Sequence, residues 1–157
     1  MAIALALVLY QIKIFHMPQG GSVTAGSMVP ILILSLRRGY RLGIITGVLY
    51  GVLRILIGGE IYYPVQVLLD YPVAFGLLGF AGFFITKPIY GVVAGIGGRF
   101  IAHLLSGAIF FGEYAPPGQN PWVYSAIYNG SYLIPELVVS ATLTYLLVKK
   151  GILEIYR

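Results

Sequence analysis

Long apolar stretches fill this chain and favour helices that cross a membrane. Of its 157 residues, 59% are hydrophobic and only 10% are charged, whereas soluble domains average about 25% charged residues. A helix needs about 20 apolar residues to cross the hydrocarbon core of a bilayer. Glycine, proline and charged residues divide the chain into six such stretches: 1–15, 22–36, 42–58, 64–86, 89–111 and 121–148. We therefore expect an all-α polytopic membrane protein with six transmembrane helices in one domain, 1–157.

The positive charges predict how these helices are oriented, because Lys and Arg accumulate in cytoplasmic connections. Alternate connections and the C-terminal end carry Arg37, Arg38, Arg41, Lys87, Lys149, Lys150 and Arg157. The other connections carry Lys13, His16, Glu60 and Glu113. This alternation predicts that both termini are cytoplasmic. It also accounts for the net charge of +5 without a nucleic-acid partner.

Five ionisable residues fall within the apolar stretches, and they are the first candidates for function. Each costs about 2.5 to 3.5 kcal/mol at the centre of a membrane helix, so it needs a partner, a wet cavity or a ligand. They are Arg54, Asp70, Arg99, His103 and Glu136. For the two arginines and Glu136, which lie near the middle of their stretches, we expect a buried Arg–Glu contact. Asp70 has two open interpretations, as a ligand group or as the structural partner of Arg54 or Arg99.

Polar and aromatic residues gather at one depth, in the outer half of the expected membrane domain. Asp70 follows Gln66 by one helical turn, and His103 lies about two turns before the outer end of its helix. The stretch that begins at residue 121 adds an aromatic-rich start, and the candidates there and nearby are Tyr62, Tyr63, Trp122, Tyr124, Tyr128, Asn129 and Tyr132. A carboxylate among aromatic rings and amides suits a flat, cationic heteroaromatic ligand. The alternatives are an interfacial aromatic belt and, for His103, a packing role.

Small residues recur at helical spacing. Gly43, Gly47 and Gly51 repeat every four residues, as do Gly91 and Gly95, which predicts close packing between helices of this chain. Alanines form a similar stripe near the N-terminus at Ala2, Ala4 and Ala6, and Ala2 and Ala6 share one helix face. That face is suited to contact with another subunit.

Several classes of function lack their signature. The chain has no Cys, which excludes disulfides and thiol chemistry, and no P-loop pattern for ATP hydrolysis. The first stretch lacks the basic start and the cleavage site of a removable signal, so we expect a retained helix. The rival hypothesis is a membrane-embedded enzyme that uses Asp70 and His103 as acid and base. Such an enzyme normally displays a nucleophile, paired carboxylates or a metal set, so we expect no catalytic residues and no metal. A membrane scaffold without a ligand is a third possibility.

Four segments carry a resemblance to a known family. They are MPQGGSVTAGSMVPI (17–31), LRRG (36–39), YYPVQVLLDYPVAF (62–75) and HLLSGAIFFGEYAPPGQNPWVYSAIYNGSYLIPE (103–136). Together they closely resemble the thiamine-specific substrate-binding subunit, or S subunit, of energy-coupling factor transporters. The resemblance extends over nearly the whole chain, and its motifs are long and unusual.

The resemblance implies roles for particular residues. The family's pocket has an acidic residue followed by Tyr on the fourth helix, matched by Asp70 and Tyr71, although some members have Glu at the acidic position. It has a His on the fifth helix and a Tyr and an Asn on the sixth, matched by His103, Tyr124 and Asn129. An aromatic ring stacks on the ligand, a role open to Phe111 or Trp122, and we add Tyr63 as a candidate. The family meets its coupling subunit through an Ala-xxx-Ala face on the first helix, matched by Ala2 and Ala6.

The implied function is capture of thiamine from outside a prokaryotic plasma membrane, with no cofactor. The implied partners are a transmembrane coupling subunit and two cytoplasmic ATPase subunits, which form a shared energising module. The thiazolium charge would be compensated chiefly by Asp70, and the aminopyrimidine edge would meet His103 and Asn129. An S subunit for another vitamin is the closest alternative.

Overall fold

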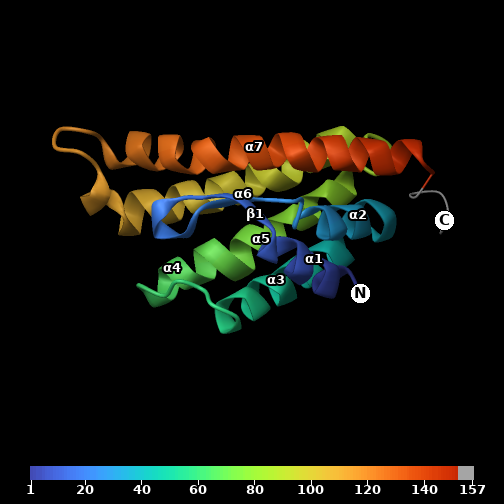
Figure 1. Cartoon of the computed structure of the whole chain (residues 1–157), viewed down its shortest axis with the longest axis horizontal. Coiled ribbons are helices and arrows are strands. Elements are labelled where there is room, and N and C mark those ends of the chain that lie inside the picture. The colour runs from blue at the N-terminus through green and yellow to red at the C-terminus, as the bar shows by residue number, and fades with distance from the viewer. Residues whose placement is uncertain (152–157) are drawn as a thin grey trace.

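The computed structural model describes residues 1–151, so Arg157, one of the charges that indicated a cytoplasmic C-terminus, lies outside the described residues. The apolar stretches fold as helical segments that run along the length of the molecule (Figure 1). The fourth segment is continuous from Pro64 to Phe83, but its middle is a π-helical turn (Leu69–Val73) and its end is a 3-10 helix (Leu77–Phe83). The α-helices are α1 (Ala2–Gln11), α2 (Val29–Arg38), α3 (Tyr40–Leu56), α4 (Pro64–Leu68), α5 (Ala74–Gly76), α6 (Pro88–Phe110) and α7 (Pro121–Lys149). The predicted all-α class with six helical segments is confirmed.

The first two stretches depart from the prediction, because part of each forms a hairpin. Strands β1 (Lys13–His16) and β2 (Ser22–Thr24) pair antiparallel, and a 3-10 turn (Pro18–Gly20) joins them. Helices over the whole of 1–15 and 22–36 were therefore a wrong prediction. Pro18 cannot donate a helical hydrogen bond, and Gly20 and Gly26 have φ of 91° and 88°, which L-residues rarely adopt. Pro18 and Gly20 therefore lie in the turn of the hairpin, and Gly26 lies before the start of α2 at Val29.

Among the described residues, three helical segments are long and apolar enough to cross a membrane alone: Pro64–Phe83, Pro88–Phe110 and Pro121–Lys149. Figure 1 shows the start of α1, the α2–α3 turn and the end of α7 towards one end of the molecule. The hairpin tip, the α3–α4 connection and the α6–α7 connection lie towards the other end. The basic turn after α2 thus lies at the same end as the start of α1, in keeping with the predicted orientation.

Glycines bring α3 against the 64–83 segment backbone to backbone, as their spacing predicted. A Cβ added to Gly47 would lie 2.1 Å from the carbonyl oxygen of Phe75, and one at Gly51 would lie 2.5 Å from that of Tyr71. Gly91 and Gly95 pack in the same way, on Ala81 and Leu78. Because Tyr71 follows Asp70, the contact at Gly51 also fixes the position of the acidic residue.

The alanine stripe of α1 faces two environments. Ala6 is 0% exposed and belongs to the hydrophobic core, whereas Ala2 is partly buried and Ala4 is exposed. The expectation that Ala2 and Ala6 form one free outer face is therefore wrong for Ala6. Helix α1 is short and packs on α2 and α3, so the face that carries Ala6 is already covered within this chain.

Replacing Gly47 with Ala should lower the thermal stability of the protein in detergent, because the added methyl group overlaps a backbone carbonyl that has little room to move. Overpacking of this kind costs about 1 to 3 kcal/mol. The matched control is Gly97→Ala on α6, where an added Cβ meets nothing within 4 Å. The control should melt at or above the wild-type temperature, because Ala is a better helix former than Gly. Equal melting temperatures for Gly47→Ala and wild type would contradict the packing described here.

Candidate functional site

Asp70 is held by two side chains within the membrane domain. It lies in the π-helical turn, which also contains Pro72; such turns often occur at functional sites. Its Oδ2 accepts a hydrogen bond of 2.7 Å from Nε2 of Gln66, one turn earlier, and its Oδ1 lies 2.9 Å from Nδ1 of His103 on α6. The His103–Asp70 contact is an ion pair only when His103 is protonated. The carboxylate is therefore fixed in place while its charge stays uncancelled if His103 is neutral.

Arg99 determines which nitrogen of His103 carries the proton. The Nε of Arg99 donates a hydrogen bond of 3.1 Å to Nε2 of His103, so that Nε2 acts as an acceptor. A neutral His103 then has its proton on Nδ1 and donates it to Asp70. Arg99 also stacks on Phe75, with 4.3 Å between the guanidinium carbon and the ring centre. The two hydrogen bonds thus run in the same direction: Arg99 donates to His103, and His103 donates to the Asp70 carboxylate.

Asn129 connects the other wall of the site to this group. Its Nδ2 donates to the carbonyl oxygens of Ser125 (2.9 Å) and His103 (3.2 Å), and its Oδ1 accepts from the hydroxyl of Tyr132 at 2.8 Å. Asn129 and Tyr132 are 5% and 4% exposed. The amide therefore joins α6 to α7 and sets the position of an aromatic ring beside His103, whose ring centre is 6.2 Å from that of Tyr132.

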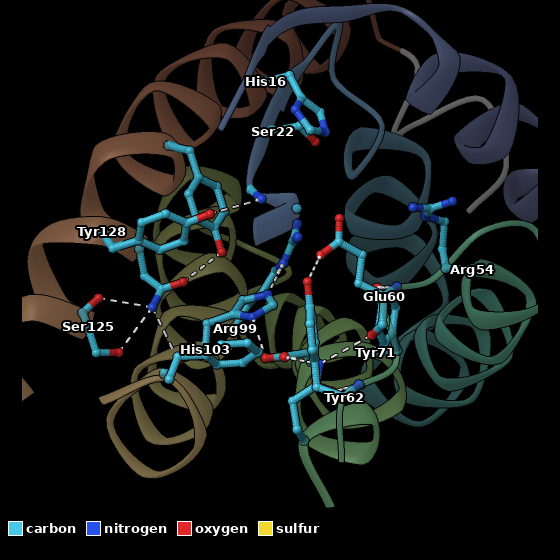
Figure 2. A pocket seen from close by; sticks show the side chains of 18 of the residues that line it. His16, Ser22, Arg54, Glu60, Tyr62, Tyr71, Arg99, His103, Ser125 and Tyr128 are labelled. Carbon is cyan, nitrogen blue, oxygen red and sulfur yellow. Dashed lines mark hydrogen bonds and ion pairs between the residues drawn. The ribbon is translucent and has the colours of Figure 1, made fainter. Parts of the chain in front are cut away.

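The hairpin covers this group from the outer end of the molecule. The hydroxyl of Tyr128 on α7 donates to the carbonyl oxygen of Pro18 and accepts from the backbone N–H of Gly21. Opposite, the Glu60 carboxylate accepts from the hydroxyl of Tyr62 at 3.0 Å, a contact that raises the pKa of that tyrosine. Figure 2 shows the hairpin above the cavity, with Tyr128 on one side and Glu60 on the other.

Most of the residues predicted from the sequence line one cavity beneath the hairpin, and two do not. The six that line it are Asp70, Tyr71, His103, Phe111, Tyr124 and Asn129. Trp122 is 49% exposed and Tyr63 is 47% exposed; Tyr63 stacks instead on Phe110. Neither belongs to the lining residues of this cavity. The part that each residue plays in binding stays a prediction.

Other lining residues had not been predicted to bind the ligand. Among them are Tyr10, Lys13, His16, Arg54, Glu60, Phe75 and Arg99; Gln66 had been noted as a neighbour of Asp70, and Tyr62, Tyr128 and Tyr132 as members of the polar and aromatic group. The hairpin accounts for Lys13 and His16, because it folds connection residues back over the cavity. Their sequence signal was the set of charged residues in the outer connections, which also contained Glu60.

The predicted contact between an arginine and Glu136 is wrong. Both oxygens of Glu136 accept hydrogen bonds of 2.6 Å from Thr24, one from its backbone N–H and one from its hydroxyl. Arg54 lies in the last turn of α3 and not near the middle of a span, with its guanidinium carbon 3.4 Å from the centre of the Tyr10 ring. Glu136 therefore connects the hairpin to α7, and Arg54 and Arg99 line the cavity.

The helical membrane fold and the polar cavity at its outer end define a membrane protein built to hold a small molecule. The model of the family described as thiamine transporter protein (Thia_YuaJ) matches residues 1–154. The chain belongs to this family. Membership places it among membrane transport proteins and not among enzymes.

Individual relatives agree with this assignment. The chain is 42% identical over 148 residues to the thiamine transporter ThiT of Bacillus subtilis (strain 168), which covers 83% of this chain and 77% of the relative. It is 31% identical over 142 residues to the thiamine transporter ThiT of Lacticaseibacillus paracasei, and that alignment covers 74% of this chain and 71% of the relative. A solved structure of ThiT from Listeria monocytogenes superposes with a TM-score of 0.86 at 25% identity and covers 96% of this chain and 90% of that one.

Replacing Asn129 with Ala should destabilise the protein, because the buried hydroxyl of Tyr132 loses its acceptor. An unsatisfied buried group costs about 1 to 3 kcal/mol. Tyr132→Phe removes the donor instead, so the double variant should lose less stability than the two single losses added together. Unfolding in detergent measures all four proteins. Strictly additive losses would show that the two side chains are not coupled.

Proposed function

We propose that this chain captures thiamine in the cavity beneath the hairpin and acts as the substrate-binding subunit of a transporter. The observation that supports this most strongly is the fixed carboxylate of Asp70, which lies with His103 in a cavity lined by aromatic rings. Thiamine has two flat heteroaromatic rings, and one of them, the thiazolium ring, carries a permanent positive charge. A carboxylate, aromatic faces and oriented polar groups are the features that such a ligand requires.

The proposed binding mode assigns a part to each predicted residue that lines the cavity. Asp70 compensates the thiazolium charge, and Tyr71 and Tyr124 supply aromatic walls. His103 and Asn129 meet the aminopyrimidine edge. Phe111 lines the cavity and makes an edge contact with Tyr62, with 5.3 Å between ring centres, which favours it over Trp122 and Tyr63 as the stacking ring.

Purified protein in detergent should bind thiamine at one site, and Asp70→Asn should weaken that binding more than binding of a neutral pyrimidine analogue. Hydrogen bonds and contacts to a charged group contribute about 1.5 to 3 kcal/mol, against about 1 kcal/mol for neutral ones. Calorimetric titration of both ligands measures the two losses. Glu113→Gln, which changes a carboxylate outside the cavity lining, is the matched control and should leave both affinities unchanged. Equal losses for the two ligands in Asp70→Asn would reject the proposed role of the charge.

We further propose that the subunit docks on an energising module made of a transmembrane coupling subunit and two cytoplasmic ATPases. The chain has no P-loop pattern of its own, so ATP hydrolysis must come from a partner. The docking surface that we propose is the exposed side of α1 that carries Ala4, because Ala6 is covered within this chain. A small residue there allows a partner helix to approach closely.

Ala4→Trp should prevent assembly with the module and uptake of thiamine, and it should leave thiamine binding to the isolated subunit unchanged. The physical reason is that a large side chain holds the partner helix away from α1. Ala6→Trp is the contrasting variant, and it should lower the melting temperature because it places an indole in the core. Co-purification, uptake and melting curves measure the three effects. Normal uptake by Ala4→Trp would show that this side of α1 is not the docking surface.

A further inference from the structure

Arg54 is a buried cation in the cavity for which the described residues supply no carboxylate partner. The residue is 5% exposed and lines the cavity. Its Nε is buried and has no hydrogen-bond partner among residues 1–151. The Tyr10 ring, 3.4 Å from the guanidinium carbon, and the C-terminal end of α3 both favour a cation. Neither supplies a negative charge, which is what a buried guanidinium ordinarily requires.

The carboxylates that line the same cavity are already engaged by other groups. Asp70 accepts from Gln66 and contacts His103, and Glu60 accepts from Tyr62. Arg99, the other arginine of the lining, donates to His103 and to the sulfur of Met28. A second cation contacts the same aromatic ring as Arg54, since Nζ of Lys13 is 4.9 Å from the centre of the Tyr10 ring.

The charged residues of the lining carry one more positive charge than negative charge. Arg54, Arg99 and Lys13 carry three positive charges, and Asp70 and Glu60 carry two negative ones, with the histidines neutral. The thiazolium ring adds a further positive charge. A phosphate monoester carries about −1.5 to −2 at pH 7 and would balance this excess.

We propose that Arg54, with Lys13, forms an anion subsite that takes a phosphate group in the same cavity. Arginine binds phosphate oxygens through paired N–H groups, and lysine adds a point charge. Figure 2 shows Arg54 on the side of the cavity opposite Ser125 and His103, with Tyr71 and Glu60 between them. A ligand that spans the cavity therefore places its ring end at His103 and its far end near Arg54. This inference rests on the proposed binding of thiamine, and its ligand is thiamine monophosphate or thiamine together with free phosphate.

The test compares the affinities of thiamine and thiamine monophosphate in wild type and in Arg54→Gln. The ratio of the Kd of the phosphate ester to the Kd of thiamine should rise about tenfold or more in the variant, as expected for the loss of a charge-assisted hydrogen bond. Arg54→Lys should restore part of this loss. Arg41→Gln removes an exposed arginine outside the cavity lining, and it should leave the ratio at the wild-type value.

A second titration distinguishes the two sources of the phosphate group. If inorganic phosphate strengthens thiamine binding in wild type but not in Arg54→Gln, the subsite takes the free anion. If only the ester depends on Arg54, the subsite takes the ligand's own phosphate. Ratios equal to wild type in Arg54→Gln, with no effect of inorganic phosphate, would overturn the proposal.

The subsite can still be tested if Arg54→Gln does not fold. Lys13 is exposed, so Lys13→Gln should fold, and it should raise the same ratio by a smaller factor. An unchanged ratio in Lys13→Gln would likewise reject the subsite. A different result would contradict the proposed function, namely wild-type protein that does not bind thiamine at all.

Discussion

A charged carboxylate within a membrane domain is the constraint on which the site depends. Asp70 is 16% exposed at its side chain, and a bilayer tolerates such a group only where it is paired or faces a polar cavity. The structure meets this requirement with an amide from its own helix and an imidazole from α6. Arg99 then fixes the imidazole through its second nitrogen. The position of one carboxylate thus determines how the 64–83 segment and α6 meet.

Close packing and the hairpin hold this arrangement together. Glycines let α3 reach the backbone of the segment that carries Asp70, so that the π-helical turn lies against a rigid neighbour. The hairpin covers the cavity and is tied down at two places, by Tyr128 near its tip and by Glu136 at Thr24. Both anchors lie on α7, which makes that helix the common support of the cover and of the Asn129 wall.

The sequence predicts the features that depend on composition and helical spacing. The lengths of the apolar stretches predicted the helical segments, and the glycine spacing predicted the close contacts between them. The positions of Asp70, His103 and Asn129 along their helices predicted that they lie at one depth, and the three line one cavity. Features that depend on a partner distant in the chain were missed. Glu136 looks like a partner for arginine by charge alone, yet Thr24 reaches it only because the hairpin folds back. Residues 22–24 directly precede an apolar stretch and were included in its predicted helix, but pairing with β1 makes them a strand.

The most direct test of the account is an experimental structure of this chain with thiamine bound. The account predicts ligand density in the cavity beneath the hairpin, with the ligand's charged ring closest to the Asp70 carboxylate and its aminopyrimidine edge at His103 and Asn129. Density at any other place, or a ligand in this cavity whose rings do not contact these side chains, would contradict it.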